Sequence, residues 1–315
     1  MTPTSSPAPR GAAFPGPIGD VGGRLMRLAT YASVGVAVLL IGAKLVAYVM
    51  TDSVSLLSTL IDSLLDMAAS LVNLVAVRAA LLPADSEHRF GHGKAEPLAA
   101  MGQSAFIAGS AMFLLVEAGN RVVNPAPLQN SDVGVAVMLL SIVATIALVA
   151  FQRYVIRRTN SVAIQADSLH YVSDLLVNIA VICALLVWRG FGWALADPLF
   201  AAGIGIYILW TAWRIARGAL DLLMDHELPE AARRKIRDIA LANPAVRELH
   251  DLKTRSSGQA AFIQFHLELD GDMKLIQAHT VSDQVELAIL AAFPGAEVII
   301  HQDPAGAPEP RMGAV

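Results

Sequence analysis

Six long apolar segments constrain the fold of this chain more than any other feature. A helix needs about 20 mostly apolar residues to cross the hydrocarbon core of a bilayer. Six segments satisfy this requirement, at roughly residues 28–50, 54–82, 97–123, 133–156, 162–188 and 197–222. The composition agrees, because 55% of the 315 residues are hydrophobic and only 16% are charged, which is too apolar for an ordinary soluble globule. We therefore predict a polytopic α-helical membrane protein with six transmembrane helices in residues 24–222.

The basic residues predict which way these helices run. An even number of crossings puts both termini on one side of the membrane, and that side carries most of the flanking positive charge. Its basic residues are Arg24, Arg27, Arg78, Arg89, Lys94, Arg153, Arg157, Arg158, Arg214 and Arg217, against Arg121 and Arg189 on the other side. By the positive-inside rule, both termini are predicted to be cytoplasmic.

Composition also predicts two tails and excludes some kinds of chemistry. Residues 1–23 are rich in Pro, Gly, Ser and Ala, so we expect a disordered tail and no cleavable signal peptide. Residues 305–315 are expected to be a second disordered tail. A single cysteine, Cys183, excludes an internal disulfide and a thiolate cluster for a soft metal. The small net charge of -4 disfavours nucleic acid as a partner.

Two pairs of ionisable residues lie inside apolar segments, each at a spacing of four. Asp62 and Asp66 belong to the second segment, and His170 and Asp174 belong to the fifth. Residues four apart sit one helical turn above each other, so each pair shares a face. At about 1.5 Å per residue, both pairs lie roughly 12 to 18 Å from the helix start, near mid-membrane. They are predicted to form a cage for one divalent cation; a polar helix interface without metal is the weaker alternative, because unpaired intramembrane carboxylates are costly.

Other residues of the apolar segments receive structural interpretations. Asp167 shares the His170 face one turn nearer the cytoplasm and is expected to be a vestibule or capping charge rather than a metal ligand. Lys44 lies near the outer end of the first segment, where a long side chain is expected to snorkel to the interface. Several glycines suit close helix approach in lipid, namely Gly35, Gly42, Gly102, Gly109, Gly203 and Gly205.

The loop between the second and third segments is a second candidate metal site. It contains Asp85, His88 and His92 at intervals of three and four. Carboxylate and imidazole are ligands that Zn²⁺ accepts, and their clustering favours metal binding over a merely solvated loop. Glu87 is an alternative ligand in the same loop.

After Met224 the pattern changes to that of a small soluble domain, predicted to span residues 223–304. Helices are expected at 229–242 and 275–292, and strands at 248–256, 259–269 and 295–302, which together make an α/β sandwich. The candidate metal ligands of this domain are His250, His266, His279, His301 and Asp303. They are expected to converge at one edge of the sheet.

These residues together resemble the cation diffusion facilitator family, and within it the bacterial ferrous-iron and zinc efflux pumps. The resemblance covers residues 25 to 304 and rests on four motifs. They are Asp62 to Asp66, Phe-Gly-His92-Gly-Lys94-Ala-Glu in the loop, Leu-His170-Tyr-Val-Ser-Asp174, and Ile-Ile-His301-Gln302-Asp303-Pro at the end. The resemblance implies a homodimeric, proton-coupled metal exporter of the bacterial inner membrane, with a metallochaperone-like (ferredoxin-like) cytoplasmic domain.

The resemblance also implies a role for each group of candidate residues. The two pairs in the apolar segments would be the transport site, and the loop residues a second metal site. The cytoplasmic ligands would form a binuclear site that holds two cytoplasmic domains together, with Gln302 near it. Lys94 and Asp225 occupy the places of a charge interlock between the two layers.

Metal selectivity and some other function classes stay open at this point. A set of three aspartates and one histidine suits Zn²⁺ and Cd²⁺, is compatible with Fe²⁺ and disfavours Mn²⁺. A membrane metallohydrolase is excluded because the chain has no His-Glu-x-x-His motif. A passive channel, a metal sensor, or an exporter with Fe²⁺ or Mn²⁺ as its main substrate remains as an alternative.

Overall fold

The computed structural model of the chain describes residues 20–51, 54–123, 132–191, 193, 195–258 and 260–306. These residues divide into a helical unit, Asp20–Leu223, and a second unit that begins at Met224. The tails predicted from composition lie mostly outside the described residues. Residues 20–23, which were expected to belong to the first tail, instead form the start of the first helix.

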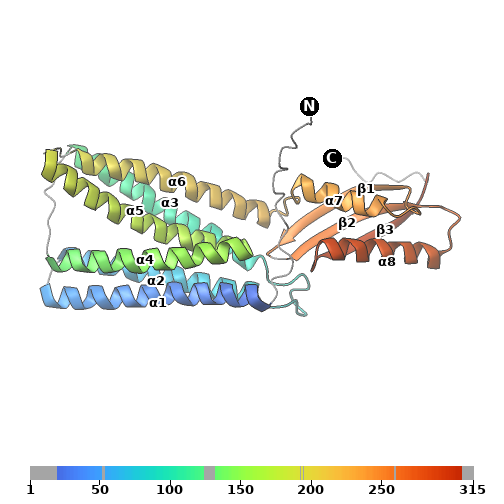
Figure 1. Cartoon of the computed structure of the whole chain (residues 1–315), viewed down its shortest axis with the longest axis horizontal. Helices are drawn as coiled ribbons and strands as arrows, with labels where there is room; N and C mark the ends of the chain where they lie inside the picture. Colours follow the sequence, from blue (N-terminus) through green and yellow to red (C-terminus); the bar gives the residue numbers. More distant parts are fainter. Residues whose placement is uncertain are drawn as a thin grey trace, which may run out of the picture. The chain divides into compact units, whose positions relative to one another are not determined.

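The helical unit contains the six predicted helices (Figure 1). They are α1 (Asp20–Thr51), α2 (Val54–Ala80), α3 (Ala95–Val123), α4 (Asp132–Thr159), α5 (Val162–Phe191) and α6 (Ala196–Leu223). All six are long and apolar enough to cross a membrane. The prediction of six transmembrane helices is therefore confirmed.

The start of α5 shows how the sequence sets a helix end. Ser161 is the residue before the helix, and its hydroxyl oxygen accepts a hydrogen bond from the backbone N–H of Ile164 at 3.2 Å, as an N-capping serine does. The buried carboxylate of Glu96 on α3 accepts a second one from the N–H of Ala163 at 3.3 Å. Negative charge at a helix N-terminus is favourable, so α5, which carries His170 and Asp174, is fixed at its first turn.

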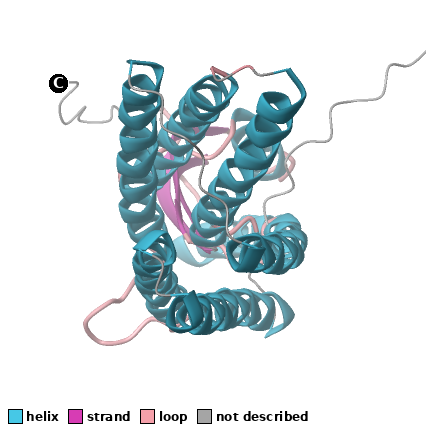
Figure 2. Ribbon diagram, turned by 90° about the vertical axis from the view of Figure 1, so that its left-hand side faces the viewer, coloured by secondary structure: helices cyan, strands magenta, loops and turns pink. Residues whose placement is uncertain are grey.

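Helix α3 lies along α6 (Figure 1), while α1, α2, α4 and α5 contact one another as neighbours in the bundle. Figure 2 shows the helices from their ends. Close approach of α3 and α6 depends on Gly205, where an added Cβ would lie 2.9 Å from Cγ and Cδ2 of Leu115. The other glycines expected to permit close packing do not do so within this chain, since an added Cβ there would meet nothing within 4 Å. The expectation holds at one position because hydropathy does not reveal which helix face meets a neighbour.

The second unit is a three-stranded sheet with two helices. Its elements are α7 (Glu230–Leu241), β1 (Glu248–Ser257), β2 (Ala260–Leu269), α8 (Leu275–Ala292) and β3 (Glu297–Pro304), as the sequence predicted. The strand order is β1-β2-β3. Strands β1 and β2 are antiparallel, and β2 and β3 are parallel, joined by the crossover through α8.

One face of this sheet is covered by the two helices, and the other carries the histidines. Ile263, Phe265 and Leu267 of β2 pack in one core with Ile236 of α7 and Ile289 of α8. Successive side chains of a strand point to opposite faces. His266 therefore points away from the helices, as do its register partners on the neighbouring strands, His250 and His301.

Candidate metal sites

Three of the four predicted transport-site residues meet between α2 and α5. The Nε2 atom of His170 lies 2.9 Å from Oδ1 of Asp66 and 3.8 Å from Oδ2 of Asp174. One ligand atom from each of the three residues lies within 4.8 Å of the others. His170 is buried, and both aspartates are half-buried. The group is compact enough to bind one cation, and it lies inside two membrane-spanning helices.

Asp62 does not belong to this compact group. It lies one turn before Asp66 on α2, and its side chain is exposed. The helical spacing keeps Asp62 and Asp66 on the same face. Its participation in the site therefore stays a prediction.

Asp167 does not have the vestibule or capping role that we expected. Its side chain is only 1% exposed and accepts hydrogen bonds from three other helices. The donors are the hydroxyl of Ser33 on α1 at 2.6 Å, the amide of Gln103 on α3 at 3.2 Å and the amide of Gln152 on α4 at 2.7 Å. The prediction was wrong because the hydrogen-bond donors are uncharged residues on three other helices, and the sequence around Asp167 does not reveal them. Isolated Ser and Gln residues within apolar segments were the signal that could have revealed them.

Lys44 also differs from its prediction, since it does not snorkel toward the interface. Its ammonium group donates hydrogen bonds to the hydroxyl of Ser63 at 2.6 Å and to the backbone carbonyl of Thr59 at 3.1 Å, both on α2. It also interacts electrostatically with Asp66 and Asp174. The partners of this charge lie within the protein, so Lys44 is a fixed cation beside the candidate transport site.

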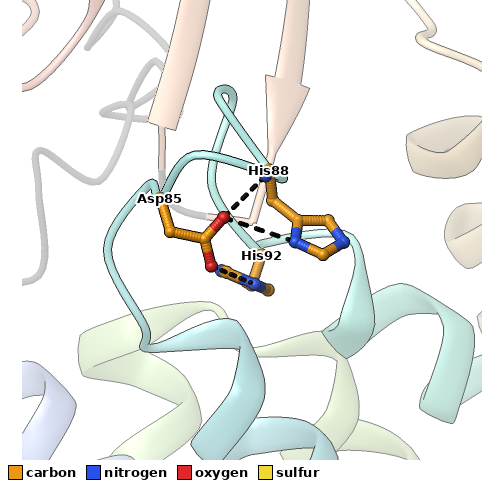
Figure 3. Close-up of side chains that lie close together, drawn as sticks. All are labelled: Asp85, His88 and His92. Carbon is orange, nitrogen blue, oxygen red and sulfur yellow. Dashed lines mark hydrogen bonds and ion pairs between the residues drawn. The ribbon is translucent and has the colours of Figure 1, made fainter.

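The loop between α2 and α3 brings its three predicted ligands together (Figure 3). Oδ1 of Asp85 lies 3.5 Å from Nδ1 of His88, and Oδ2 lies 3.4 Å from Nε2 of His92. Asp85 also accepts hydrogen bonds from the backbone N–H groups of His88 at 2.6 Å and Glu87 at 2.9 Å. The hydrogen bond from the backbone N–H of His88, and after it that from Glu87, lowers the pKa of the Asp85 carboxyl below its usual range. Asp85 is therefore an anionic ligand at neutral pH.

The arrangement of the loop fits a metal in two further respects. The three ligand atoms lie within 4.8 Å of one another. The buried Nδ1 atom of His92 has no hydrogen-bond partner among the described residues, and a buried imidazole nitrogen without a partner is costly. Glu87 contributes its backbone N–H to Asp85 rather than joining the group of ligand atoms.

The sheet of the second unit assembles a third group, formed by His250, His266 and Asp303. Oδ2 of Asp303 lies 2.7 Å from Nδ1 of His266 and 3.6 Å from Nε2 of His250. His301 lies beside it, with Nε2 3.2 Å from Oδ1 of Asp303. The strand register explains the cluster, because His250 pairs with His266 and His266 pairs with His301.

Two residues predicted for this site lie elsewhere. His279 on α8 is exposed and pairs with Asp283 at 3.6 Å. Gln302 donates a hydrogen bond to the hydroxyl of Ser282 on α8 at 2.9 Å, which places its amide on the helix side of the sheet. Gln302 follows His301 in the strand, so the alternation of side chains turns it to the opposite face.

Two carboxylates near the same site were missed. Glu268 lies 3.5 Å from His250, and Asp251 lies 3.8 Å from His266. A hydrogen bond from Lys253 lowers the pKa of the Asp251 carboxyl. The signals available were the position of Glu268 two residues after His266, on the same strand face, and the adjacency of Asp251 to His250.

The predicted charge interlock stays a prediction. Lys94 belongs to the helical unit, where its ammonium group donates a hydrogen bond to the carbonyl of Leu223 at 3.3 Å. Asp225 belongs to the second unit, where Oδ1 lies 3.5 Å from the guanidinium of Arg255. Each residue therefore has an electrostatic partner within its own unit.

Comparison with known proteins accounts for nearly the whole chain. The cation efflux transmembrane domain matches residues 30–224, and the cytoplasmic domain of cation efflux proteins matches residues 228–305. This chain belongs to the cation diffusion facilitator family. It is therefore a multi-pass membrane protein and a transporter rather than an enzyme, as the resemblance implied.

Individual relatives of this cation diffusion facilitator are similar over almost their full length. The cation-efflux pump FieF of Klebsiella pneumoniae is 53% identical over 283 residues, which are 90% of this chain and 94% of that protein. FieF of Salmonella paratyphi A is 51% identical over the same shares. A solved structure of the protein CzrB in its zinc form is 37% identical over 27% of this chain and 98% of its own, with a TM-score of 0.26.

Proposed function

We propose that this cation diffusion facilitator exports divalent transition-metal cations from the cytoplasm in exchange for protons, with Zn²⁺ as the main substrate and Cd²⁺ or Fe²⁺ also accepted. The observation that supports this most strongly is the group of Asp66, His170 and Asp174 inside two membrane-spanning helices. Imidazole and carboxylate are ligands of Zn²⁺. The names of the relatives, which are cation-efflux pumps, support the direction of transport.

Proton exchange follows from the chemistry of these ligands. Metal ligation needs a neutral imidazole and ionised carboxylates, so loading the site displaces the protons that those groups hold. Metal and protons then compete for one site. With Asp62 as the fourth ligand, the site loads metal while it is open to the cytoplasm. After a rocking movement exposes it to the other side, protons replace the metal and reset the carrier.

The other two metal sites have a regulatory or structural role in this proposal. The protein is a homodimer in the bacterial inner membrane, with both termini cytoplasmic by the positive-inside rule. Zn²⁺ on the His250, His266 and Asp303 group holds the two cytoplasmic domains together, and Asp85, His88 and His92 bind a further ion in the loop. In the sheet site and in the loop site, imidazole and carboxylate ligand atoms lie within 4.8 Å of one another.

A vesicle assay tests the proposal directly. Zn²⁺ uptake into everted vesicles is measured under an imposed proton gradient, for the unaltered protein and for Asp174→Ala. We expect the substitution to reduce uptake to background, because it removes a charged ligand. Asp221→Ala, which removes a half-buried carboxylate of α6 outside the site, is the control. Undiminished Zn²⁺ uptake by the Asp174→Ala variant would contradict the proposal.

The same assay separates the alternatives. A passive channel equilibrates metal and a sensor moves none, whereas an antiporter accumulates metal against its gradient only while the proton gradient lasts. Collapsing that gradient should therefore stop accumulation. Parallel measurements with Zn²⁺, Cd²⁺, Fe²⁺ and Mn²⁺ identify the main substrate. A higher rate for Fe²⁺ or Mn²⁺ than for Zn²⁺ would replace the metal in the proposal but not the mechanism.

A further inference from the structure

A groove of about 300 Å³ lies between α4, α5 and α6, at the ends of these helices that the proposed orientation places at the cytoplasmic side. Exposed arginines line it from two different helices, Arg153 from α4 and Arg214 from α6. Gln165 and Ser168 of α5 add polar groups to its floor. An arginine inside the membrane costs free energy unless an anion or water contacts it. We therefore expect an anionic ligand or water beside Arg153 and Arg214.

This groove is separate from the cation path. On α5, the groove is lined by Val162, Gln165, Ser168, Leu169 and Val172. The candidate transport residue His170 and its helix neighbour Asp174 lie on the other side of α5. With about 100° of rotation per residue, these two stripes point roughly 180° apart. A ligand in the groove therefore contacts the surface of the bundle and leaves the transport site free.

The arginines of the groove lie nearer the cytoplasm than the deepest part of its lining. At about 1.5 Å per residue, Arg153 and Arg214 lie roughly 9 and 13 Å from the inner ends of their helices, near the boundary of the hydrocarbon. Deeper in the membrane the groove is lined by Val172, Thr211 and Tyr207, roughly 15, 18 and 24 Å from the inner ends of their helices. A phospholipid likewise carries its charged phosphate nearer the membrane surface than its apolar chains.

Aromatic residues of α6 lie beside the groove and on the outer surface of the bundle. The guanidinium of Arg214 lies 4.9 Å from the ring centroid of Trp210, which fixes its direction by cation–π attraction. Trp210, Trp213 and Tyr207 are exposed, as expected for side chains on a helix surface that faces lipid. The groove therefore opens toward lipid.

We propose that this groove binds one anionic phospholipid of the inner leaflet, with its phosphate between Arg153 and Arg214 and one acyl chain along α5. Arginine is suited to phosphate because its planar guanidinium donates two parallel hydrogen bonds. Basic pockets between transmembrane helices on the cytoplasmic side have the chemistry that anionic headgroups require. The assignment to the inner leaflet rests on the proposed function, which places both termini in the cytoplasm. The binding of an anionic phospholipid in the groove does not depend on that orientation.

Native mass spectrometry of the full-length protein in detergent tests this site. The protein is titrated with dioleoylphosphatidylglycerol and with dioleoylphosphatidylcholine, which has the same chains but no net charge. We expect tighter binding of phosphatidylglycerol. The double variant Arg153→Gln, Arg214→Gln should weaken it by about tenfold or more, since each basic residue near an anionic headgroup contributes roughly fivefold.

Two further variants separate the groove from general surface charge. Arg157→Gln with Arg217→Gln removes the same charge from the same two helices, within about one turn and outside the groove, and should change the affinity by less than about threefold. Gly218→Leu keeps the charge but fills the groove, because an added Cβ there meets nothing within 4 Å. We expect it to weaken lipid binding while the protein still folds.

Three results would overturn the proposal. Equal affinities for the two lipids would show that the groove does not recognise an anion. Equal losses in the two arginine double variants would assign the effect to surface charge in general. Unchanged lipid binding in Gly218→Leu together with a loss of dimer would identify the groove as a contact between protein copies.

Discussion

At the scale of single residues, buried polar groups of the membrane unit find their partners across helices. Asp167 accepts its hydrogen bonds from residues that lie 134, 64 and 15 positions away in the sequence. Ser33, one of these donors, also accepts a hydrogen bond from Gln152 at 3.0 Å, so the groups form one network over four helices. A buried carboxylate is tolerated here because its oxygen atoms are satisfied by donors.

The network can be tested by reversing its hydrogen bonds. Asp167→Asn places an amide donor against the donors of Gln152 and Ser33, and leaving such groups unpaired costs about 1–3 kcal/mol. We expect a clearly lower thermal unfolding midpoint in detergent. Adding Gln152→Glu restores an acceptor opposite the new donor, and Ser33 can reorient its hydroxyl, so the double variant should recover most of the loss. An unfolding midpoint that Gln152→Glu lowers further would contradict this network.

Lys44 gives a prediction about metal affinity. Its positive charge lies beside Asp66 and Asp174 and repels a divalent cation there. Lys44→Gln should tighten Zn²⁺ binding at the transport site by about tenfold, given the size of charge interactions in partly buried surroundings, and slow metal release during turnover. Lys44→Arg, which keeps the charge, should behave like the unaltered protein.

The Zn²⁺ affinity of the transport site can be measured only if the other two metal sites of the chain do not bind Zn²⁺. Titration calorimetry is therefore performed in a background with Asp85→Ala and His266→Ala, which disables the loop and sheet groups. Stopped-flow transport then reports the release rate. Equal affinities of the Gln and Arg variants would show that the charge of Lys44 does not act on the bound cation.

At the scale of secondary-structure elements, the α3–α6 pair depends on one glycine. Gly205→Ala forces its new methyl group against Leu115, and such overpacking costs about 1–3 kcal/mol. We expect a lower unfolding midpoint. Gly203→Ala, two residues away on the same helix and facing open space within this chain, should be neutral. Adding Leu115→Ala to Gly205→Ala should recover part of the lost stability, because it removes the side chain that the new methyl group meets. Equal destabilisation by Gly205→Ala and Gly203→Ala would contradict the packing argument.

The small sheet shows a related effect of element geometry. The alternation of side chains along β2 sends Phe265 into the core and His266 to the opposite face. The register of three strands then aligns three histidines in a row. The same alternation removes Gln302 from the site, although it is adjacent to His301 in the sequence. Neighbours along a strand are thus separated, while residues far apart are brought together.

At the scale of the whole molecule, the proposed role of the sheet site is to draw two copies of the cytoplasmic domain together. Spin labels on Ala288→Cys, an exposed position of α8, in a Cys183→Ser background allow the distance between two protomers to be measured by electron–electron double resonance. We expect Zn²⁺ to shorten and narrow this distance. In the double variant His266→Ala, Asp303→Ala, Zn²⁺ should not change the distance. If Zn²⁺ also leaves the distance unchanged in the protein with an intact sheet site, the proposed role is contradicted.

The sequence by itself determined the elements of this protein and the pairing of ligands within them. Helix length, hydropathy and strand alternation are local properties, so the six membrane helices and the five elements after them follow from short stretches of chain. The spacing of Asp66 from Asp62 and of Asp174 from His170 is likewise local. Family membership follows from the same motifs.

Only the tertiary structure decided which of these residues meet. The rotation of each helix about its axis selects the neighbours of a side chain, and hydropathy along one helix does not specify that rotation. For this reason Asp167 proved to be buried among three donors, and Lys44 to be bound to α2. For the same reason the groove lined by Arg153 and Arg214 is visible only when α4, α5 and α6 are placed side by side.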